Sequence, residues 1–185
     1  MRRSEVCGLR WQDVDFEQNT IYIRHKVLET RINGQSEVMQ TNELKTESSR
    51  RAFALVPTIR ELLLKRRQWT EENRRLWGDC YDHTYDEYIF TLADGSLLTP
   101  ERVSDRFRGF IERHSFKKIR FHDLRHTNAT LLIAAGVNVK TVSAHLGHST
   151  IATTANIYAH QIQSAEAAAA DALEEKLRIA KRKHA

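Results

Sequence analysis

The chain has 185 residues, of which 41% are hydrophobic and 29% are charged, and its formal net charge is +5. This length fits one globular domain, or one domain with a short appendage, and it can bury a core without disulfides or metals. No apolar run approaches the length of a membrane span and the first residues lack a signal-peptide stretch, so we expect no membrane segment. Cys7 and Cys80 lie far apart, which favours two free thiols in a reducing compartment over a disulfide framework.

The excess of basic residues favours a polyanionic partner. A single basic cluster is more often a solvated face than a binding site. Several clusters in one small chain modestly favour nucleic acid as the binding partner. The clusters are Lys65–Arg67, Arg74–Arg75, Arg106 with Arg108, Lys117–Arg120 and Lys181–Lys183.

The first third of the chain predicts a short helix followed by strands. Val6 and Leu9 share one face of a helix over 3–10, and the alternation of apolar and polar residues over 20–28 predicts a strand. Asn33-Gly34 is a turn signal. Further strands are expected over 38–42 and 51–56, with residues 45–48 at a hairpin tip.

The remainder predicts helices. Pro57 and Thr99-Pro100 are typical of helix starts, whereas Gly136 and Gly147 are typical of helix ends. Helices are expected over 57–76, 101–114, 122–135, 139–146, from about 150 through Tyr158, and over the Ala-rich tail from 164 to 183. The fold class is therefore α+β and mainly α-helical, with a small antiparallel β-sheet near the N-terminus.

Four polar side chains in the helical half stand out, although each has an ordinary structural interpretation. His122 and Arg125 are three apart on a helix and share a face, as surface pairs often do. His148 directly follows a helix-ending glycine, and Tyr158 by itself would be a half-buried core aromatic. A zinc site at His145 and His148 is disfavoured, because no cysteine or acidic pair completes a tetrahedral set.

Taken together, the sequence motifs favour a functional interpretation of these residues over a structural one. H-D-L-R-H-T over 122–127, L-G-H-S-T over 146–150 and I-Y-A-H over 157–160 resemble the tyrosine recombinase family of phage integrases, particularly the integrases of conjugative transposons. R-x-x-E over 2–5, followed by L-x-W-x-D, is similar to the first arginine box of that family, and residues 45–51 resemble its lysine hairpin, K-T-x-x-S-x-R. These matches stand in family order and span nearly the whole chain, which makes the resemblance specific.

The resemblance implies a set of active-site residues. Arg2, Arg125 and His148 would bind the scissile phosphate, and Tyr158 would be the nucleophile. The other implied members are His122 as acceptor of the tyrosine proton, Lys45 as general acid, and Glu5 as a supporting residue that orients its neighbours. Arg10 and His126 would be structural. No metal and no cofactor are expected, because the arginines supply the charge neutralisation.

The function implied by the resemblance is site-specific DNA recombination, in which DNA is cut and rejoined through a covalent 3′-phosphotyrosine intermediate. Double-stranded DNA would be the partner, and the protein would self-associate on DNA into a tetramer. Accessory DNA-bending proteins are further candidate partners. No membrane is involved, and we expect a cytoplasmic protein at the bacterial nucleoid.

The resemblance also suggests the domain organisation. Residues 1–162 would form the catalytic domain, without the helix that precedes the arginine box in the family, and residues 163–185 would form a tail helix that docks on a neighbouring protomer. Two alternatives stay open. One is a truncated, non-catalytic DNA-binding remnant, since Arg2 at a frayed terminus would be poorly positioned. The other is DNA relaxation of the type IB topoisomerase kind, which uses a similar site.

Overall fold

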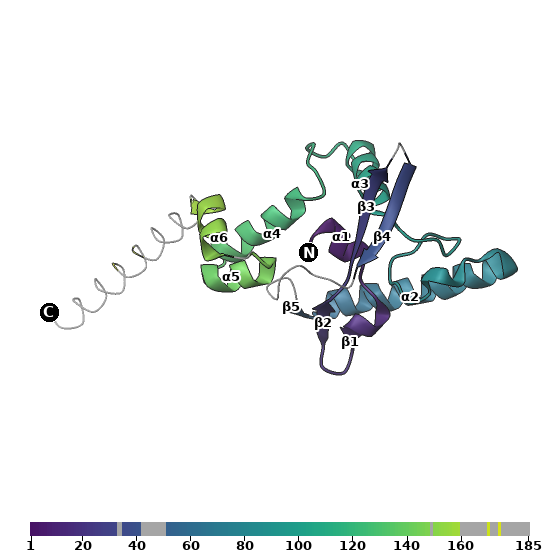
Figure 1. Ribbon diagram of the computed structural model, residues 1–185. Helices are drawn as coiled ribbons and strands as arrows, with labels where there is room; N and C mark the ends of the chain where they lie inside the picture. The colour runs from purple at the N-terminus through teal and green to yellow at the C-terminus, as the bar shows by residue number, and fades with distance from the viewer. Residues whose placement is uncertain (33–34, 42–50, 149, 160–169, 171–173, 175–185) are drawn as a thin grey trace. The chain divides into compact units, whose positions relative to one another are not determined.

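The computed structural model describes residues 1–32, 35–41, 51–148, 150–159, 170 and 174. They fall into two compact units, Met1–Arg125 and His126–Ala185. The first unit holds the strands together with α1, α2 and α3, and the second is helical (Figure 1). The predicted class, mainly helical with a small antiparallel sheet near the N-terminus, is confirmed. Among the residues described, no helix is both long and apolar enough to cross a membrane.

The strands of the first unit form two separate antiparallel sheets. The first sheet has three strands in the order β1-β2-β5, and the second is the two-stranded ribbon β3-β4. The strand bounds are β1 Val14–Asp15, β2 Thr20–Ile23, β3 Lys26–Ile32, β4 Gln35–Thr41 and β5 Arg51–Ala54. β5 pairs with β2 in a register that places Phe53 opposite Ile21. The predicted hairpin tip at 45–48 lies outside the described residues.

The prediction of one continuous strand over 20–28 was wrong, because the chain changes sheets at Arg24 and His25. The carboxylate of Asp13 is fully buried and lies 3.5 Å from His25 Nε2 and 4.0 Å from Arg24 Nη1. A buried carboxylate is costly unless polar groups lie close to it. The chain leaves the first sheet at these two residues, between β2 and β3.

Helix α1 (Arg3–Cys7) ends directly against the start of β3. A Cβ atom at Gly8 would lie 2.6 Å from Lys26 Cα, a separation that real side chains do not adopt. Only glycine allows the two backbones to approach this closely. The end of α1 is therefore fixed to the ribbon.

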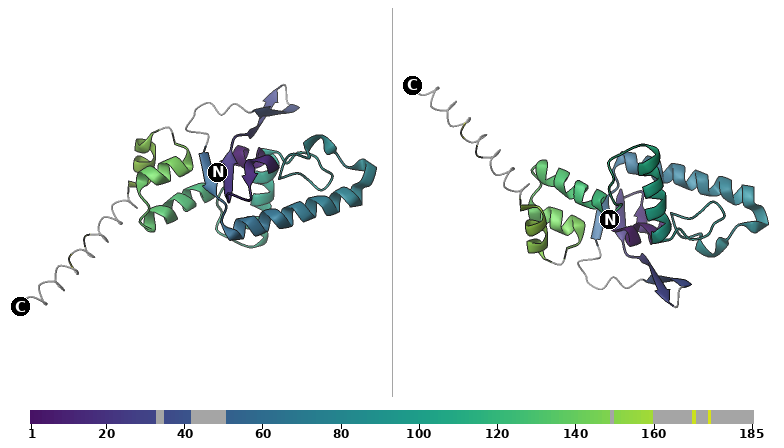
Figure 2. Two further views of the ribbon diagram at one scale, coloured as in Figure 1. Left: turned by 90° about the horizontal axis from the view of Figure 1, so that it is seen from below. Right: turned by 90° about the horizontal axis from the view of Figure 1, so that it is seen from above.

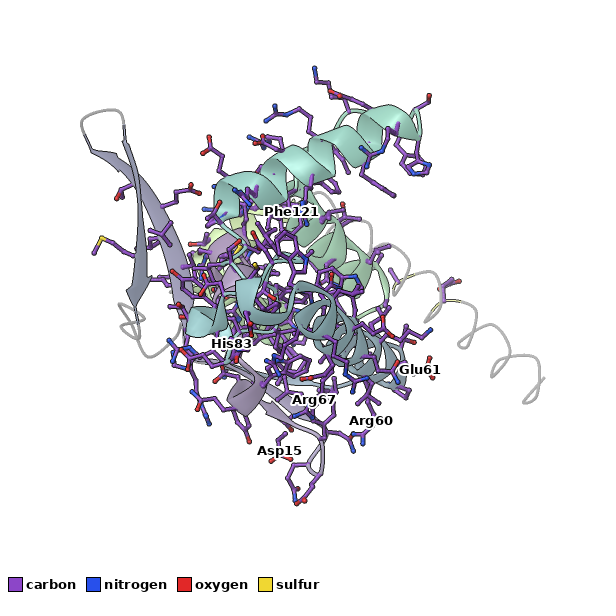
Figure 3. The ribbon with its side chains drawn as sticks, turned by 90° about the vertical axis from the view of Figure 1, so that its right-hand side faces the viewer. Asp15, Arg60, Glu61, Arg67, His83 and Phe121 are labelled. Atoms are coloured by element: carbon purple, nitrogen blue, oxygen red, sulfur yellow. The ribbon has the colours of Figure 1, made fainter. Side chains whose placement is uncertain are left out.

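Helix α2 (Pro57–Trp77) runs beside the three-stranded sheet (Figure 2). It begins with Pro57 in its first turn, as predicted, and Leu63 packs into a buried cluster with sheet residues such as Ile21 and Ile23. Four arginines of α2 lie over aromatic rings, and two of them, labelled in Figure 3, meet rings from the start of the chain: Arg60 lies over Phe16 at 5.1 Å and Arg67 over Trp11 at 5.3 Å.

Helix α3 (Pro100–Arg113) covers another side of the first unit. The hydroxyl of Thr99 accepts from the backbone N–H of Arg102, which caps the helix at the predicted residue. The segment before α3 contains the single-turn helices η3 (Gly78–Cys80) and η4 (His83–Tyr85). After α3 the chain returns along the helix, and Phe121 meets the ring of Phe107 edge-on with centroids 5.5 Å apart (Figure 3).

In the part of the second unit that the structure describes up to residue 159, three helices pack around a small core. They are α4 (Asp123–Ala134), which begins at the end of the first unit, α5 (Val139–Leu146) and α6 (Ile151–Ile157). Gly136 and Gly147 end α4 and α5 with φ of 80° and 66°, the left-handed conformation that glycine adopts without strain. The core consists of Ala129, Ile133, Val142, Leu146 and Tyr158. Apart from residues 170 and 174, the predicted tail helix lies outside the described residues.

Candidate active site

The R-x-x-E motif forms the first turn of α1 and fixes Arg2 at its N-terminus. Glu5, 2% exposed, accepts from the backbone N–H of Arg2 and also from Arg2 Nη1 at 3.0 Å. The spacing of three is the one at which a carboxylate in the first turn reaches back to the residue that starts the helix. Arg2 is therefore held by its backbone and its side chain together.

A second arginine completes this cluster. Arg51, at the start of β5, donates from Nη1 and Nη2 to the two oxygens of Glu5 at 3.0 and 2.7 Å. Burial alone would raise the pKa of Glu5, but the hydrogen bonds from Arg51 and Arg2 outweigh it, so the pKa lies below its ordinary value. Glu5 therefore stays ionised and keeps both guanidinium groups in place.

Arg2 and His122 line the same cavity of the first unit, although they come from its two ends. The cavity has a volume of about 1130 Å³ and lies among α1, β3, α3 and the segment that leads to α4. His122 is exposed in the turn before α4. Cations and carboxylates share the lining, and Arg120 pairs with Asp123 at 2.9 Å. The lining of the cavity therefore carries both signs of charge, and the binding of an anion there would depend on contacts with individual cationic side chains.

Arg125 occupies the first turn of α4 and is 7% exposed. Its backbone N–H donates to the carbonyl of His122 at 3.0 Å, which ties the two predicted residues to one turn. The pKa of the Met1 amino group is lowered to about 6, first by burial and then by the charge of Arg125. That effect places the Arg125 guanidinium within electrostatic reach of the start of α1, where Arg2 lies.

In the second unit, His148 follows the left-handed Gly147 and is fixed by two contacts. Its backbone N–H donates to the carbonyl of Ser143 at 3.1 Å, and its Nδ1 lies 2.8 Å from the hydroxyl of Thr154, which is fully buried. A hydrogen bond at one ring nitrogen fixes the orientation of an imidazole and the tautomer it adopts. The ring of His148 is thus set by α6.

Tyr158 directly follows the last residue of α6, and its side chain is 3% exposed. The ring packs in the core of the second unit. The phenol oxygen lies 2.8 Å from Nδ1 of His126, on α4. The hydroxyl of the predicted nucleophile therefore meets a titratable ring within its own unit.

The structure brings some of the predicted residues together. Arg2, Glu5, His122 and Arg125 belong to the first unit, and His148 and Tyr158 belong to the second. Lys45 lies outside the described residues. Among those residues, no group of histidine, cysteine and acidic side chains could hold a metal ion.

Three residues of these clusters were not selected from the sequence. Arg51 is the last letter of the K-T-x-x-S-x-R pattern, which was a usable signal. His126 was interpreted as structural, because an adjacent Arg125 and a helical period say nothing about a tyrosine 32 positions later. Thr154 carried no signal at all, since a threonine inside a short helix is ordinary.

Comparison with known proteins agrees with these motifs. The chain matches the Phage integrase family over residues 1–164, and it belongs to that family. It is 30% identical over 178 residues to a tyrosine recombinase XerC-like protein of Caldanaerobacter subterraneus subsp. tengcongensis, covering 94% of this chain and 46% of the relative. It is also 30% identical over 181 residues to the ICEBs1 integrase of Bacillus subtilis, covering 96% of this chain and 46% of the relative. The family resemblance predicted from the sequence is confirmed.

The fold has a solved counterpart. The Tn1549 transposon integrase, in a complex with transposon right end DNA, matches with a TM-score of 0.72 at 24% identity, covering 94% of this chain and 55% of that one. At this identity the likeness establishes the fold. The chain spans about half the length of the relatives it matches.

Proposed function

We propose that this chain is the catalytic part of a site-specific DNA recombinase, which cuts and rejoins double-stranded DNA through a covalent 3′-phosphotyrosine intermediate. The observation that supports this most directly is the cavity shared by Arg2 and His122, two residues that the family motifs select independently from the two ends of the first unit. Membership of the Phage integrase family supports the same reaction.

The arginines would neutralise the phosphate. A phosphodiester is anionic, so it resists attack by another oxygen until its non-bridging oxygens are neutralised. The planar guanidinium groups of Arg2 and Arg125 offer forked donors for those oxygens and keep their charge when they are desolvated. His148 would add a further donor. Such donors stabilise most strongly the charge that develops in the pentavalent transition state.

Tyr158 would be the nucleophile. Its phenol oxygen forms the new bond to phosphorus while the bond from phosphorus to the 5′ oxygen breaks. Phenols ordinarily ionise near pH 10, so the hydroxyl needs a proton acceptor at neutral pH, a role we assign to His122. The 5′ oxygen leaves as a hydroxyl and takes a proton from a general acid, for which Lys45 is our candidate.

The covalent linkage allows strand exchange without an external energy source. The phosphotyrosine ester retains the free energy of the phosphodiester, so the 5′-hydroxyl of a partner strand can attack it and release Tyr158. Exchange between two duplexes needs several protomers, and we propose self-association on DNA into a tetramer, with residues 163–185 docking in trans and accessory DNA-bending proteins assisting. The site of action would be the bacterial nucleoid.

Covalent trapping tests the proposal. The chain is incubated without metal with a pool of nicked duplexes of randomised sequence, and adducts are resolved on a denaturing gel. We expect an adduct that Tyr158→Phe abolishes while DNA binding persists. Tyr88→Phe is the matched control, because Tyr88 is also buried and its hydroxyl also has a side-chain partner, Arg10 Nη2 at 3.0 Å. An adduct that survives Tyr158→Phe would refute the nucleophile, and a parent chain that binds DNA without any adduct would refute catalysis by this chain.

A further inference from the structure

Tyr158 is held both at its backbone and at its hydroxyl. Its backbone N–H donates to the carbonyl of Thr154 at 3.0 Å, which closes the last turn of α6. At the ring end, the hydroxyl lies 2.8 Å from Nδ1 of His126. The two rings are tilted by 49° with centroids 6.1 Å apart, so they meet through these polar atoms and do not stack. A buried hydroxyl costs free energy unless it has such a partner.

The histidine end of this contact is rigidly supported. His126 lies on α4 one turn before Ala129, which is fully buried, and two turns before Ile133, which is 3% exposed. Both of these residues pack in the cluster that contains the ring of Tyr158. Side chains three and four residues apart on a helix share a face, so His126 is carried by the same face of α4 that forms this core.

The tyrosine end is much less supported by its own helix. α6 has seven residues, and Tyr158 lies just beyond its last helical residue, with φ of −114° and ψ of 22°. A helix of this length has little stability of its own and depends on tertiary contacts. The position of the phenol oxygen therefore depends on the packing of the ring in the core and on the contact at the hydroxyl.

From these contacts we propose that His126 is a further member of the active site, which positions the nucleophile by a hydrogen bond to the Tyr158 hydroxyl. The inference rests on the proposed function, because it concerns the oxygen that would attack the phosphate. A misplacement of about 1 Å at a reacting atom can cost about 10²-fold in rate. The contact with His126 restrains the atom whose placement matters most.

Two substitutions separate positioning from packing. His126→Leu keeps an apolar side chain of similar size on α4 but offers nothing to the hydroxyl. His126→Asn places a donor and an acceptor close to the position of Nδ1, whichever role the ring plays. The matched control is His145→Leu, because His145 lies in the same unit and also bonds to a side chain of α4, with Nε2 3.1 Å from Asn128 Oδ1.

The rate of covalent adduct formation is measured in a single turnover on a nicked duplex selected from the randomised pool, and DNA affinity is measured separately. We expect His126→Leu to lower the rate by about 10²-fold with unchanged affinity, because DNA binding does not need an oriented phenol. His126→Asn should recover at least tenfold of that loss, and His145→Leu should match the parent. The proposal is overturned if His126→Leu reacts as fast as the parent or faster, or if the asparagine variant is as slow as the leucine variant.

A second measurement does not depend on cleavage, so it tests the contact even if the proposed function fails. Long-range ¹H–¹⁵N correlation spectra record the ring nitrogens of the nine histidines in the full chain. Tyr158→Phe removes only the hydroxyl oxygen, and we expect it to shift the Nδ1 resonance of His126 while that of His145 stays in place. An unchanged His126 resonance would overturn the proposal. A shifted resonance, in a parent chain that binds DNA but forms no adduct, would refute catalysis by this chain and leave the contact between His126 and Tyr158 standing.

Discussion

Glu5→Gln removes a buried negative charge that lies between the guanidinium groups of Arg2 and Arg51. The pair with Arg51 is buried on both sides, at 2% and 7% exposure, and breaking such a pair costs about 3–5 kcal/mol because a charge is left behind without its partner. Arg2 is 38% exposed, so its pair adds at most about 1 kcal/mol. The total unfolding free energy of a domain is about 5–15 kcal/mol, so the substitution should remove a large part of it.

Thermal unfolding followed by tryptophan fluorescence measures this loss in the right part of the chain. The three tryptophans, at positions 11, 69 and 77, all lie in the unit that contains Glu5. At about 2–4 °C per kcal/mol for a chain of this length, we expect the melting temperature to fall by roughly 6–20 °C. Glu87→Gln is the control, because Glu87 pairs with Arg10 at 3.2 Å but its side chain is 48% exposed. A fall no larger than that of the control would refute the reasoning.

The same substitution should change the dependence of stability on acid. The pKa of Glu5 is lowered in the folded chain, so its contribution is complete above the ordinary glutamate value of about 4.3 and is lost as the pH falls through the lower folded value. The parent should therefore lose more stability than Glu5→Gln below about pH 4. Parallel curves for the two chains in that range would contradict the assigned charge state.

Three further outcomes are expected. Thr154→Val should slow adduct formation by about tenfold, because Nδ1 of His148 loses its partner, whereas Thr154→Ser should not; single-turnover rates decide. Cys80 should react with a maleimide in the folded chain and Cys7 should not, because burial raises the pKa of the Cys7 thiol to about 12; mass spectrometry of the labelled peptides checks this. Ile133→Ala should destabilise the second unit by about 2–5 kcal/mol, measured by hydrogen exchange, with the tryptophan transition unchanged.

The helices could be predicted because their boundaries are encoded locally. Pro57 in the first turn of α2, Thr99 before Pro100 and the left-handed Gly147 each act within a few residues of the boundary that they set. The break between β2 and β3 could not be predicted in this way. At the break, Arg24 and His25 contact the buried carboxylate of Asp13, more than ten residues earlier in the sequence, and the alternation of residues 20–28 continues through the break.

The sequence selects candidate site residues, but it says little about the contacts that position them. The motifs name Arg2, His122 and Tyr158, because family resemblance is carried by residue types and spacing. The motifs do not say what holds each residue. The contact of Tyr158 with His126 joins the end of α6 to α4, 32 residues earlier in the chain, so it follows from packing, and no local pattern records it.

The close approach at Gly8 has a consequence for transplanting this site. A five-residue helix has almost no stability as an isolated segment, so the position of Arg2 depends on the structure against which α1 packs. Here that support is the backbone of Lys26, a neighbour that only a missing side chain permits. A designer who copied only the R-x-x-E turn into another scaffold would therefore transfer the motif residues without the contact that fixes the position of their helix. The portable unit is the turn, the glycine three residues after the glutamate, and the strand that crosses beneath it.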